Sequence, residues 1–246
     1  MIGIFDSGVG GLSALIPLEK LMPRADLLYY ADTAALPLGM KSDGEILDRL
    51  SLALRFFERV GVTGVLLACG TASSLLTKEC KEKFSFPIID IISPTAVAAK
   101  GLPKHSHVLL LATPAAIRAG AFASALARKD QILFSLPCPR LVRLAERGKP
   151  SLSAMRRALG VAPRIKPDAV VLGCTHFSHL KTEISSLLPS ARLIDAAHCA
   201  AAAAAARFDH GGEGSCRFLV TGDPYPFEKR ASTILHRPVK AEKITP

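Results

Sequence analysis

The sequence predicts an α/β fold built from two similar three-layer lobes, each with a mostly parallel sheet, related by an internal duplication. Three observations lead to this prediction. The chain of 246 residues is long enough for two domains of common size. Short runs of continuous apolar residues alternate with segments of helical length, as in parallel sheets covered on both faces. The apolar runs also recur at a nearly constant offset, which is typical of a repeat.

The expected strands occur in corresponding pairs. Residues 2–5 match residues 108–111, residues 27–30 match 132–135, residues 65–69 match 170–174, and residues 88–90 match 193–195. The last three pairs lie 105 residues apart, and the first lies within a residue or two of that offset. Residues 217–220 form a further expected strand, which belongs to neither copy and returns to the first lobe.

Helices are expected between these strands, with right-handed crossovers. They cover residues 12–21, 45–60, 71–83, 115–127 and 180–188. The offset places the change of lobe near residues 93–99. We therefore predict a first lobe of residues 1–95 plus 207–246, a second lobe of residues 96–206, and an active site in the cleft between them.

Composition narrows the class of protein. With 49% hydrophobic and 21% charged residues, the chain is expected to be globular. The chain has no Trp to form a stacking platform for nucleic acid. Its net charge is +10, but the sequence has no run of five basic residues. We therefore expect the basic residues to lie on solvated faces, and we expect no nucleic acid partner. The start lacks a secretion signal, and the apolar run at 196–206 is shorter than the roughly 18 residues of a membrane span. We expect a cytoplasmic protein without membrane contact.

Two of the six cysteines stand out by position. The chain has no CxxC pair and no structural-zinc spacing, so we expect free thiols and no metal. Cys69 and Cys174 directly follow equivalent strands, where parallel sheets bind their ligands. A helix start at each thiol favours thiolate and can lower the cysteine pKa from its usual value of about 8.5. The other four are interpreted as packing residues: Cys80, Cys138, Cys199 and Cys216.

A polar turn follows the first expected strand. Asp6, Ser7 and Gly8 lead into a helix and offer backbone N–H groups and a hydroxyl to a small anion such as a carboxylate. Residues 6–11 do not form a dinucleotide fingerprint, because Ser13 stands where a third glycine is needed. Asp6 could equally cap the helix.

Hydroxyl groups and a histidine lie beside the two thiols. Thr71 and Thr175 could cap helices, hold the carboxylate and amine of an amino acid, or do both. His176 lies two residues after Cys174 and is close enough to exchange a proton with it or to orient it. These groups point to a small-molecule substrate.

Two thiols in this arrangement fit three chemistries: a disulfide switch, a nucleophile with an accessory group, or an acid–base pair. The redox interpretation is the weakest, because neither thiol has a neighbouring resolving cysteine. An acid–base pair needs one thiolate and one thiol on opposite faces of a substrate carbon. A nearly symmetric cleft between two lobes provides that pair.

Five stretches together resemble the glutamate racemase family of the aspartate/glutamate racemase superfamily: residues 2–12, 31–33, 37–39, 68–73 and 172–176. The resemblance runs nearly end to end. It implies cofactor-independent interconversion of L-glutamate and D-glutamate, with the D-isomer used in bacterial peptidoglycan. A homodimer remains open as its assembly.

The resemblance also implies roles for individual residues. Cys69 and Cys174 would be the acid–base catalysts, with Asp6 assisting the first thiol and His176 the second, and Glu146 near the second. The residues implied to bind substrate are Ser7, Leu38, Gly39, Gly70, Thr71, Thr175 and His176.

The chain departs from the family pattern at three places. Gly70 replaces a usual Asn, Leu38 replaces a usual Tyr, and Phe177-Ser178 replaces Tyr-Pro. Loss of one hydrogen-bonding group can cost about 1 to 3 kcal/mol of binding or activation free energy. Two alternatives therefore stay open: a related isomerase acting on aspartate or a similar acid, and a binding protein with a decayed racemase site.

Overall fold

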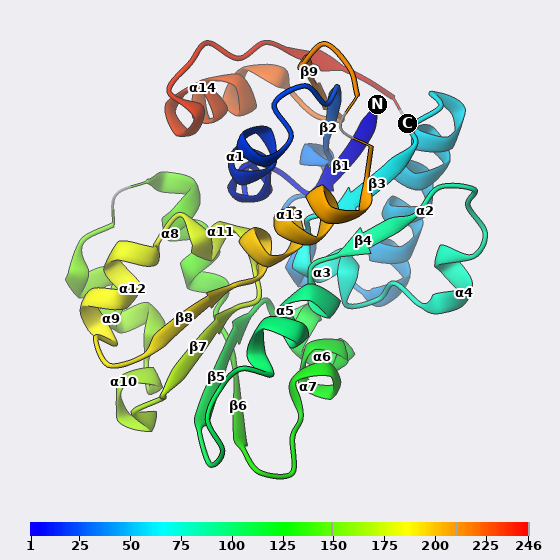
Figure 1. Cartoon of the computed structure of the whole chain (residues 1–246). Helices are drawn as coiled ribbons and strands as arrows, with labels where there is room; N and C mark the ends of the chain where they lie inside the picture. The colour runs from blue at the N-terminus through cyan, green and yellow to red at the C-terminus, as the bar shows by residue number, and fades with distance from the viewer. Residues whose placement is uncertain (149, 210, 246) are drawn as a thin grey trace.

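The computed structural model describes residues 1–148, 150–209 and 211–245. It contains two parallel β-sheets, each with helices on both sides (Figure 1). The predicted α/β fold class is thus confirmed.

The first sheet has six strands in the order β10-β9-β2-β1-β3-β4. Their bounds are β1 Ile2–Asp6, β2 Leu27–Ala31, β3 Gly64–Leu67, β4 Ile88–Asp90, β9 Cys216–Val220 and β10 Ala241–Lys243. Every pair of neighbours is parallel. The first three strands in the chain are buried along their whole length, which explains their continuous apolar sequence.

The second sheet has four parallel strands in the order β6-β5-β7-β8. Their bounds are β5 His107–Ala112, β6 Ile132–Pro137, β7 Ala169–Leu172 and β8 Arg192–Asp195. Phe5 of β1 pairs with Leu67 of β3, and Leu111 of β5 pairs with Leu172 of β7 at the equivalent register. The repeat in the sequence is therefore a repeat in strand pairing. The residue limits of the two lobes stay a prediction.

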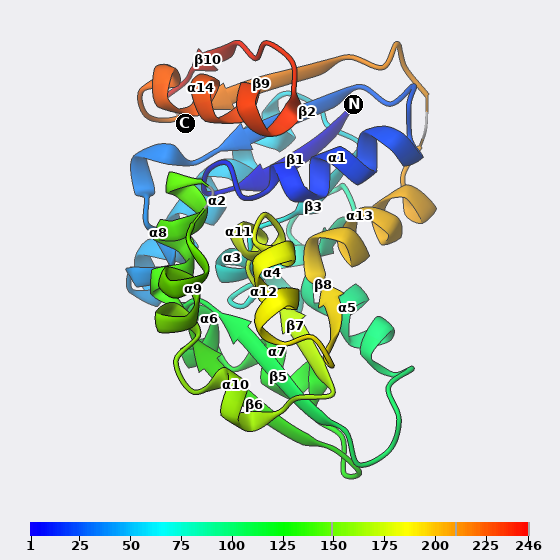
Figure 2. The same ribbon diagram turned by 90° about the vertical axis from the view of Figure 1, so that its left-hand side faces the viewer.

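Helices pack between the two sheets and on their outer faces. Helices α1 Leu12–Leu21 and α5 Ile92–Ala99 both pack against α13 Ala196–Arg207, and Figure 2 shows α1 and α13 between the sheets. One hydrophobic cluster includes residues from these helices and from both sheets. A continuous core therefore joins the two halves behind the site.

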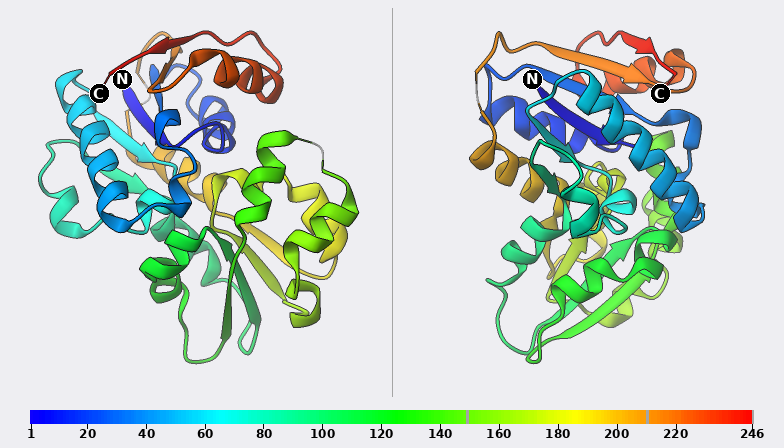
Figure 3. Two further views of the ribbon diagram at one scale, coloured as in Figure 1. Left: turned by 180° about the vertical axis from the view of Figure 1, so that it is seen from behind. Right: turned by 90° about the vertical axis from the view of Figure 1, so that its right-hand side faces the viewer.

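Helix α2, Asp43–Arg59, covers the outer face of the first sheet (Figure 3). It begins at a capping box in which Ser42 and Glu45 bind each other's backbone. Its buried stripe follows the helical period, and its members are Ile46, Leu50, Ala53, Leu54 and Phe57.

Two expected helices are each broken into two. Residues 71–83 form α3 Gly70–Ser73 and α4 Lys78–Lys81, because Ser74 Oγ bonds Gly70 O at 2.7 Å and Thr77 caps a new helix. Residues 115–127 form α6 Pro114–Ala119 and α7 Ala121–Leu126, because Gly120 adopts a φ of 73° and ends the first helix.

The remaining helical segments complete the fold. They are η1 Thr33–Ala35, η2 Leu38–Met40, α8 Pro139–Arg147, α9 Leu152–Leu159, α10 Ala162–Ile165, α11 Thr175–Ser178, α12 Lys181–Leu187 and α14 Pro224–Leu235. Within the described ranges, no helix has the length and apolar character needed to cross a membrane.

Candidate active site

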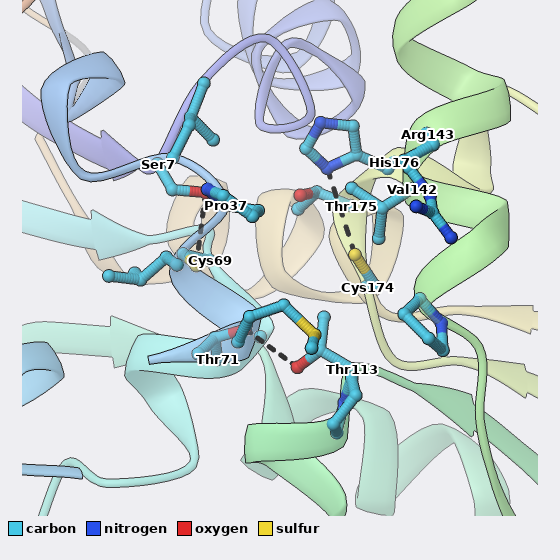
Figure 4. A pocket seen from close by; sticks show the side chains of 17 residues that line it. Ser7, Pro37, Cys69, Thr71, Thr113, Val142, Arg143, Cys174, Thr175 and His176 are labelled. Carbon is cyan, nitrogen blue, oxygen red and sulfur yellow. Dashed lines mark hydrogen bonds between the residues drawn. The ribbon is translucent and has the colours of Figure 1, made fainter. Parts of the chain in front are cut away.

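A cavity of about 210 Å³ lies where the strands of both sheets end. Residues from both halves line it: Ser7, Leu38, Gly39, Cys69, Gly70, Thr71, Thr113, Cys174, Thr175 and His176. Figure 4 shows Cys69 and Cys174 on opposite sides of the same space. The fold thus brings together the two thiols that the sequence singled out.

Cys69 follows β3 and is 4% exposed. Its Sγ lies 3.9 Å from Ser7 Oγ, to which the thiol donates a weak hydrogen bond. Burial, with a further contribution from the negative charge of Asp6, raises the pKa of Cys69 to about 12. The expectation that a helix start lowers this pKa is therefore wrong for Cys69, because α3 is a single turn and burial outweighs it.

Cys174 follows β7 and begins a chain of three polar side chains. Its Sγ lies 3.9 Å from His176 Nδ1. The other ring nitrogen of His176, Nε2, binds Glu146 Oε1 on α8. A proton can therefore pass between the thiol and the imidazole, while the carboxylate holds the ring in place.

The charges of His176 and Glu146 reinforce each other. Burial alone would lower the pKa of His176, but its hydrogen bonds to Cys174 and Glu146 raise that pKa well above the ordinary value. Burial alone would raise the pKa of Glu146, but the hydrogen bond and positive charge of His176 lower it. The pair is thus an imidazolium and a carboxylate at neutral pH.

Asp6 is fully buried at the end of β1. Its Oδ1 accepts a hydrogen bond of 2.9 Å from Gly8 N, and its Oδ2 accepts one of 3.0 Å from Thr175 Oγ1. Burial raises the pKa of Asp6, although His176 and these hydrogen bonds act against that rise. The carboxylate therefore contacts the residue beside the second thiol and acts on Cys69 only through its charge.

Sequence reasoning did not identify Thr113. Its hydroxyl lies 2.9 Å from Thr71 Oγ1, and it also caps α6. Because Asp6 ends β1 where Ala112 ends β5, Thr113 is the counterpart of Ser7 in the repeat. The offset of the first strand pair, which is one residue longer than the offset between the two thiols, could have located this threonine.

Arg143 and Arg230 were also not predicted. Arg143 lines the cavity from α8, and among the described lining residues it alone carries a permanent positive charge. Arg230, on α14, donates from Nη2 to Ala145 O at 2.6 Å, next to Glu146. The C-terminal segment thereby holds the end of the helix that presents Glu146 to His176.

Gly70 leaves no room for a larger side chain. A Cβ atom built on Gly70 would overlap the carbonyl oxygen of Gly173, the residue before Cys174. The two cysteine-bearing loops therefore touch at this glycine. The Asn usual in the family could fit here only if one loop moved, so its loss does not simply leave a gap.

The six cysteines are free thiols. In the described part of the chain, no three His, Cys, Asp or Glu side chains come together as a metal site.

The fold agrees with comparisons to known proteins. A family model described as Asp/Glu/Hydantoin racemase matches residues 20–204, and the chain belongs to this family and is an amino-acid racemase. Its curated relatives include glutamate racemase of Thermus thermophilus, 34% identical over 99% of this chain and 96% of the relative.

Solved structures lead to the same family. Glutamate racemase from Thermus thermophilus in complex with β-chloro-D-alanine has a TM-score of 0.88 and 35% identity, covering 99% of this chain and 96% of that one. Glutamate racemase from Francisella tularensis in complex with D-glutamate has a TM-score of 0.88 and 26% identity, covering 99% and 97%. The resemblance seen in the sequence motifs is thus confirmed.

Proposed function

We propose that this chain interconverts L-glutamate and D-glutamate by transferring a proton at Cα between two thiols, without a cofactor, and that the D-isomer serves peptidoglycan synthesis. The observation that carries the proposal is the placement of Cys69 and Cys174 at equivalent strand ends, on opposite sides of one cavity. The names of the relatives support glutamate as the substrate.

In one direction, the thiolate of one cysteine takes the Cα proton, and the electron pair of the C–H bond remains on the substrate. The thiol of the other cysteine then donates its proton to the opposite face of the carbon and becomes the thiolate. The thiol and thiolate have exchanged roles, so the reverse reaction follows the same path. No group other than the two thiols needs to change charge between substrate and product.

A positive charge beside a cysteine sulfur favours its thiolate form. Beside Cys174, the positive His176 ring can donate a hydrogen bond to sulfur, and Glu146 keeps that ring charged. Cys69 has a pKa of about 12, and in the part of the chain that the structure describes its side-chain hydrogen-bond partner is the neutral hydroxyl of Ser7. We propose that the ammonium group of the bound amino acid supplies the positive charge that favours the Cys69 thiolate.

The proposed substrate contacts are hydroxyl and backbone groups from both lobes. The hydroxyls of Ser7, Thr71 and Thr175 face the cavity, and Thr113 joins them through its bond to Thr71. Such groups can bind a carboxylate or an ammonium ion. Leu38 and Gly39 would close the cavity on the η2 side.

A second candidate is the same reaction on another acidic amino acid. Two polar groups usual in the family are missing at Gly70 and Leu38, and the Gly70–Gly173 contact shapes the cavity between the thiols. A panel of acidic amino acids in the exchange assay described below would separate the two substrates.

The test is incubation of the purified protein with L-glutamate in heavy water without added cofactor. We expect D-glutamate with deuterium at Cα, and loss of this product in the Cys69→Ser and Cys174→Ser variants. Cys80→Ser, a change of the same chemistry outside the cavity, should leave the rate unchanged. If both active-site variants behave like wild type, the two-thiol proposal is wrong. A cytoplasmic location and a homodimer stay predictions.

A further inference from the structure

A groove between α8 and α9 is lined by four arginines. Arg140, Arg143 and Arg147 lie on one face of α8, at spacings of three and four residues, and Arg157 faces them from α9. Figure 2 shows the two helices side by side. The groove has a volume of about 430 Å³, and its remaining lining residues are Leu144, Ala154 and Ala158.

The four arginines have no carboxylate partner among the described residues. In the described ranges, none of the four arginines forms an ion pair, and no carboxylate lines the groove. Five arginines elsewhere do pair with carboxylates: Arg49, Arg118, Arg128, Arg217 and Arg237. Since like charges at helical spacing repel one another, the groove favours binding of an anion.

The sequence around the groove also has an excess of positive charge. Residues 139–167 contain eight Lys and Arg residues and one acidic residue, Glu146, so they carry +7 of the net charge of +10. Glu146 already binds His176. The excess positive charge of the chain is therefore concentrated in this one stretch of the sequence, and four of its arginines line the groove.

We propose that this groove binds a compact anion carrying two or more phosphate groups. Each guanidinium can bind two phosphate oxygens at once, and four of them around one groove suit a multiply charged ligand. The small side chains of Ala154 and Ala158 leave the anion access to the arginines. Among the described residues that line the groove, none has an aromatic ring to stack a base, so the phosphates themselves are the recognised groups.

The proposal does not depend on the racemase activity and is tested by binding alone. The probe is sodium tripolyphosphate, titrated calorimetrically into the full chain. The variant Arg140→Gln/Arg147→Gln/Arg157→Gln removes three of the charges and leaves Arg143, which also lines the candidate active site. We expect saturable binding of one equivalent by the wild type, weakened about tenfold or more in this variant.

The matched control is Arg24→Gln/Arg55→Gln/Arg192→Gln. These three arginines are also exposed and form no ion pair in the described ranges, so the net charge changes equally. The control should bind within about twofold of wild type, because distant surface charges are screened by salt. Since all six substituted side chains are exposed, both variants should melt like wild type.

Three results would overturn the proposal. The wild type could show no saturable binding, or the two triple variants could lose affinity equally, which would reflect net charge alone. The third is that a short single-stranded oligonucleotide binds more tightly than tripolyphosphate and loses affinity in the groove variant. The groove would then be a nucleic acid contact.

Discussion

The Asp6 carboxylate, at the end of the first strand, accepts a hydrogen bond of 3.0 Å from the hydroxyl of Thr175, 169 residues later in the chain. Both residues are buried. This bond ties the turn after β1 to the residue that directly follows Cys174. The two halves of the repeat therefore share a hydrogen bond at the site, and the carboxylate assigned to the first thiol by resemblance lies against the neighbour of the second.

Replacing Asp6 with Asn should make stability less dependent on pH. Because burial raises the pKa of Asp6 in the folded state, the folded protein holds this proton more tightly than the unfolded chain does. Wild-type stability is therefore lost as pH rises from 3.8 through the raised value. Asn keeps the shape of the side chain without the charge.

Urea unfolding near pH 4 and near pH 7 measures this effect. We expect the Asp6→Asn variant to gain in free energy of unfolding relative to wild type as pH rises over that range of about three units. A difference that is the same at both pH values would contradict the burial argument. Asp48 is exposed and forms no ion pair among the described residues, so Asp48→Asn provides the control for loss of a carboxylate.

Replacing Glu146 with Gln should lower the pKa of His176. The carboxylate is one of the groups that hold this pKa well above its ordinary value, and Gln removes its charge while keeping a hydrogen-bonding side chain. Nuclear magnetic resonance of the imidazole should show a lower titration midpoint in the variant. An unchanged midpoint would mean that Glu146 does not set the charge of His176.

The same pair predicts a pH window for stability. The His176 contribution is complete below 6.5 and is lost as pH rises through its raised pKa. The Glu146 contribution is present above 4.5 and is lost as pH falls through its lowered pKa. Glu146→Gln should therefore destabilise the protein most between about pH 4.5 and 6.5, as measured by urea unfolding. If the loss of stability in Glu146→Gln were largest outside this pH range, it would contradict an ion pair between His176 and Glu146.

Replacing Gly70 with Ala should destabilise the protein by about 1 to 3 kcal/mol, the usual cost of forcing an extra group into packed space. The reason is the overlap of the new Cβ with the Gly173 carbonyl. Gly44→Ala is the matched control, because a Cβ on Gly44 meets nothing within 4 Å. In thermal or urea unfolding, Gly70→Ala should be clearly less stable than both the wild type and the control. Equal stability of the two variants would contradict the contact between Gly70 and Gly173.

Cys69 should react slowly with iodoacetamide in the absence of substrate. With a pKa of about 12, only about one thiol in ten thousand is ionised near pH 8. Cys80 is more exposed and should be alkylated first, which peptide mass spectrometry can follow over time. Faster labelling of Cys69 than of Cys80 would show that its thiolate forms without a substrate.

The apolar runs at 65–69 and 170–174 predicted two parallel strands ending in cysteines, and the structure has β3 and β7 there in equivalent registers. These two strands could be predicted because a strand buried on both faces requires continuous apolar residues, and such a run is visible in the local sequence. Helices at 71–83 and 115–127 were predicted less well. The hydrogen bond of Ser74 interrupts the first segment, and the left-handed backbone of Gly120 interrupts the second. The spacing of apolar residues does not predict either interruption.

Residue types and their spacing were enough to predict the α/β class, the repeat and the equivalence of Cys69 and Cys174. Three further properties emerged from the folded arrangement: Asp6 binds Thr175, Gly70 touches Gly173, and burial raises the pKa of Cys69. Those properties depend on how closely two distant loops approach and on what they exclude from water, which is fixed only when both halves pack around one cavity.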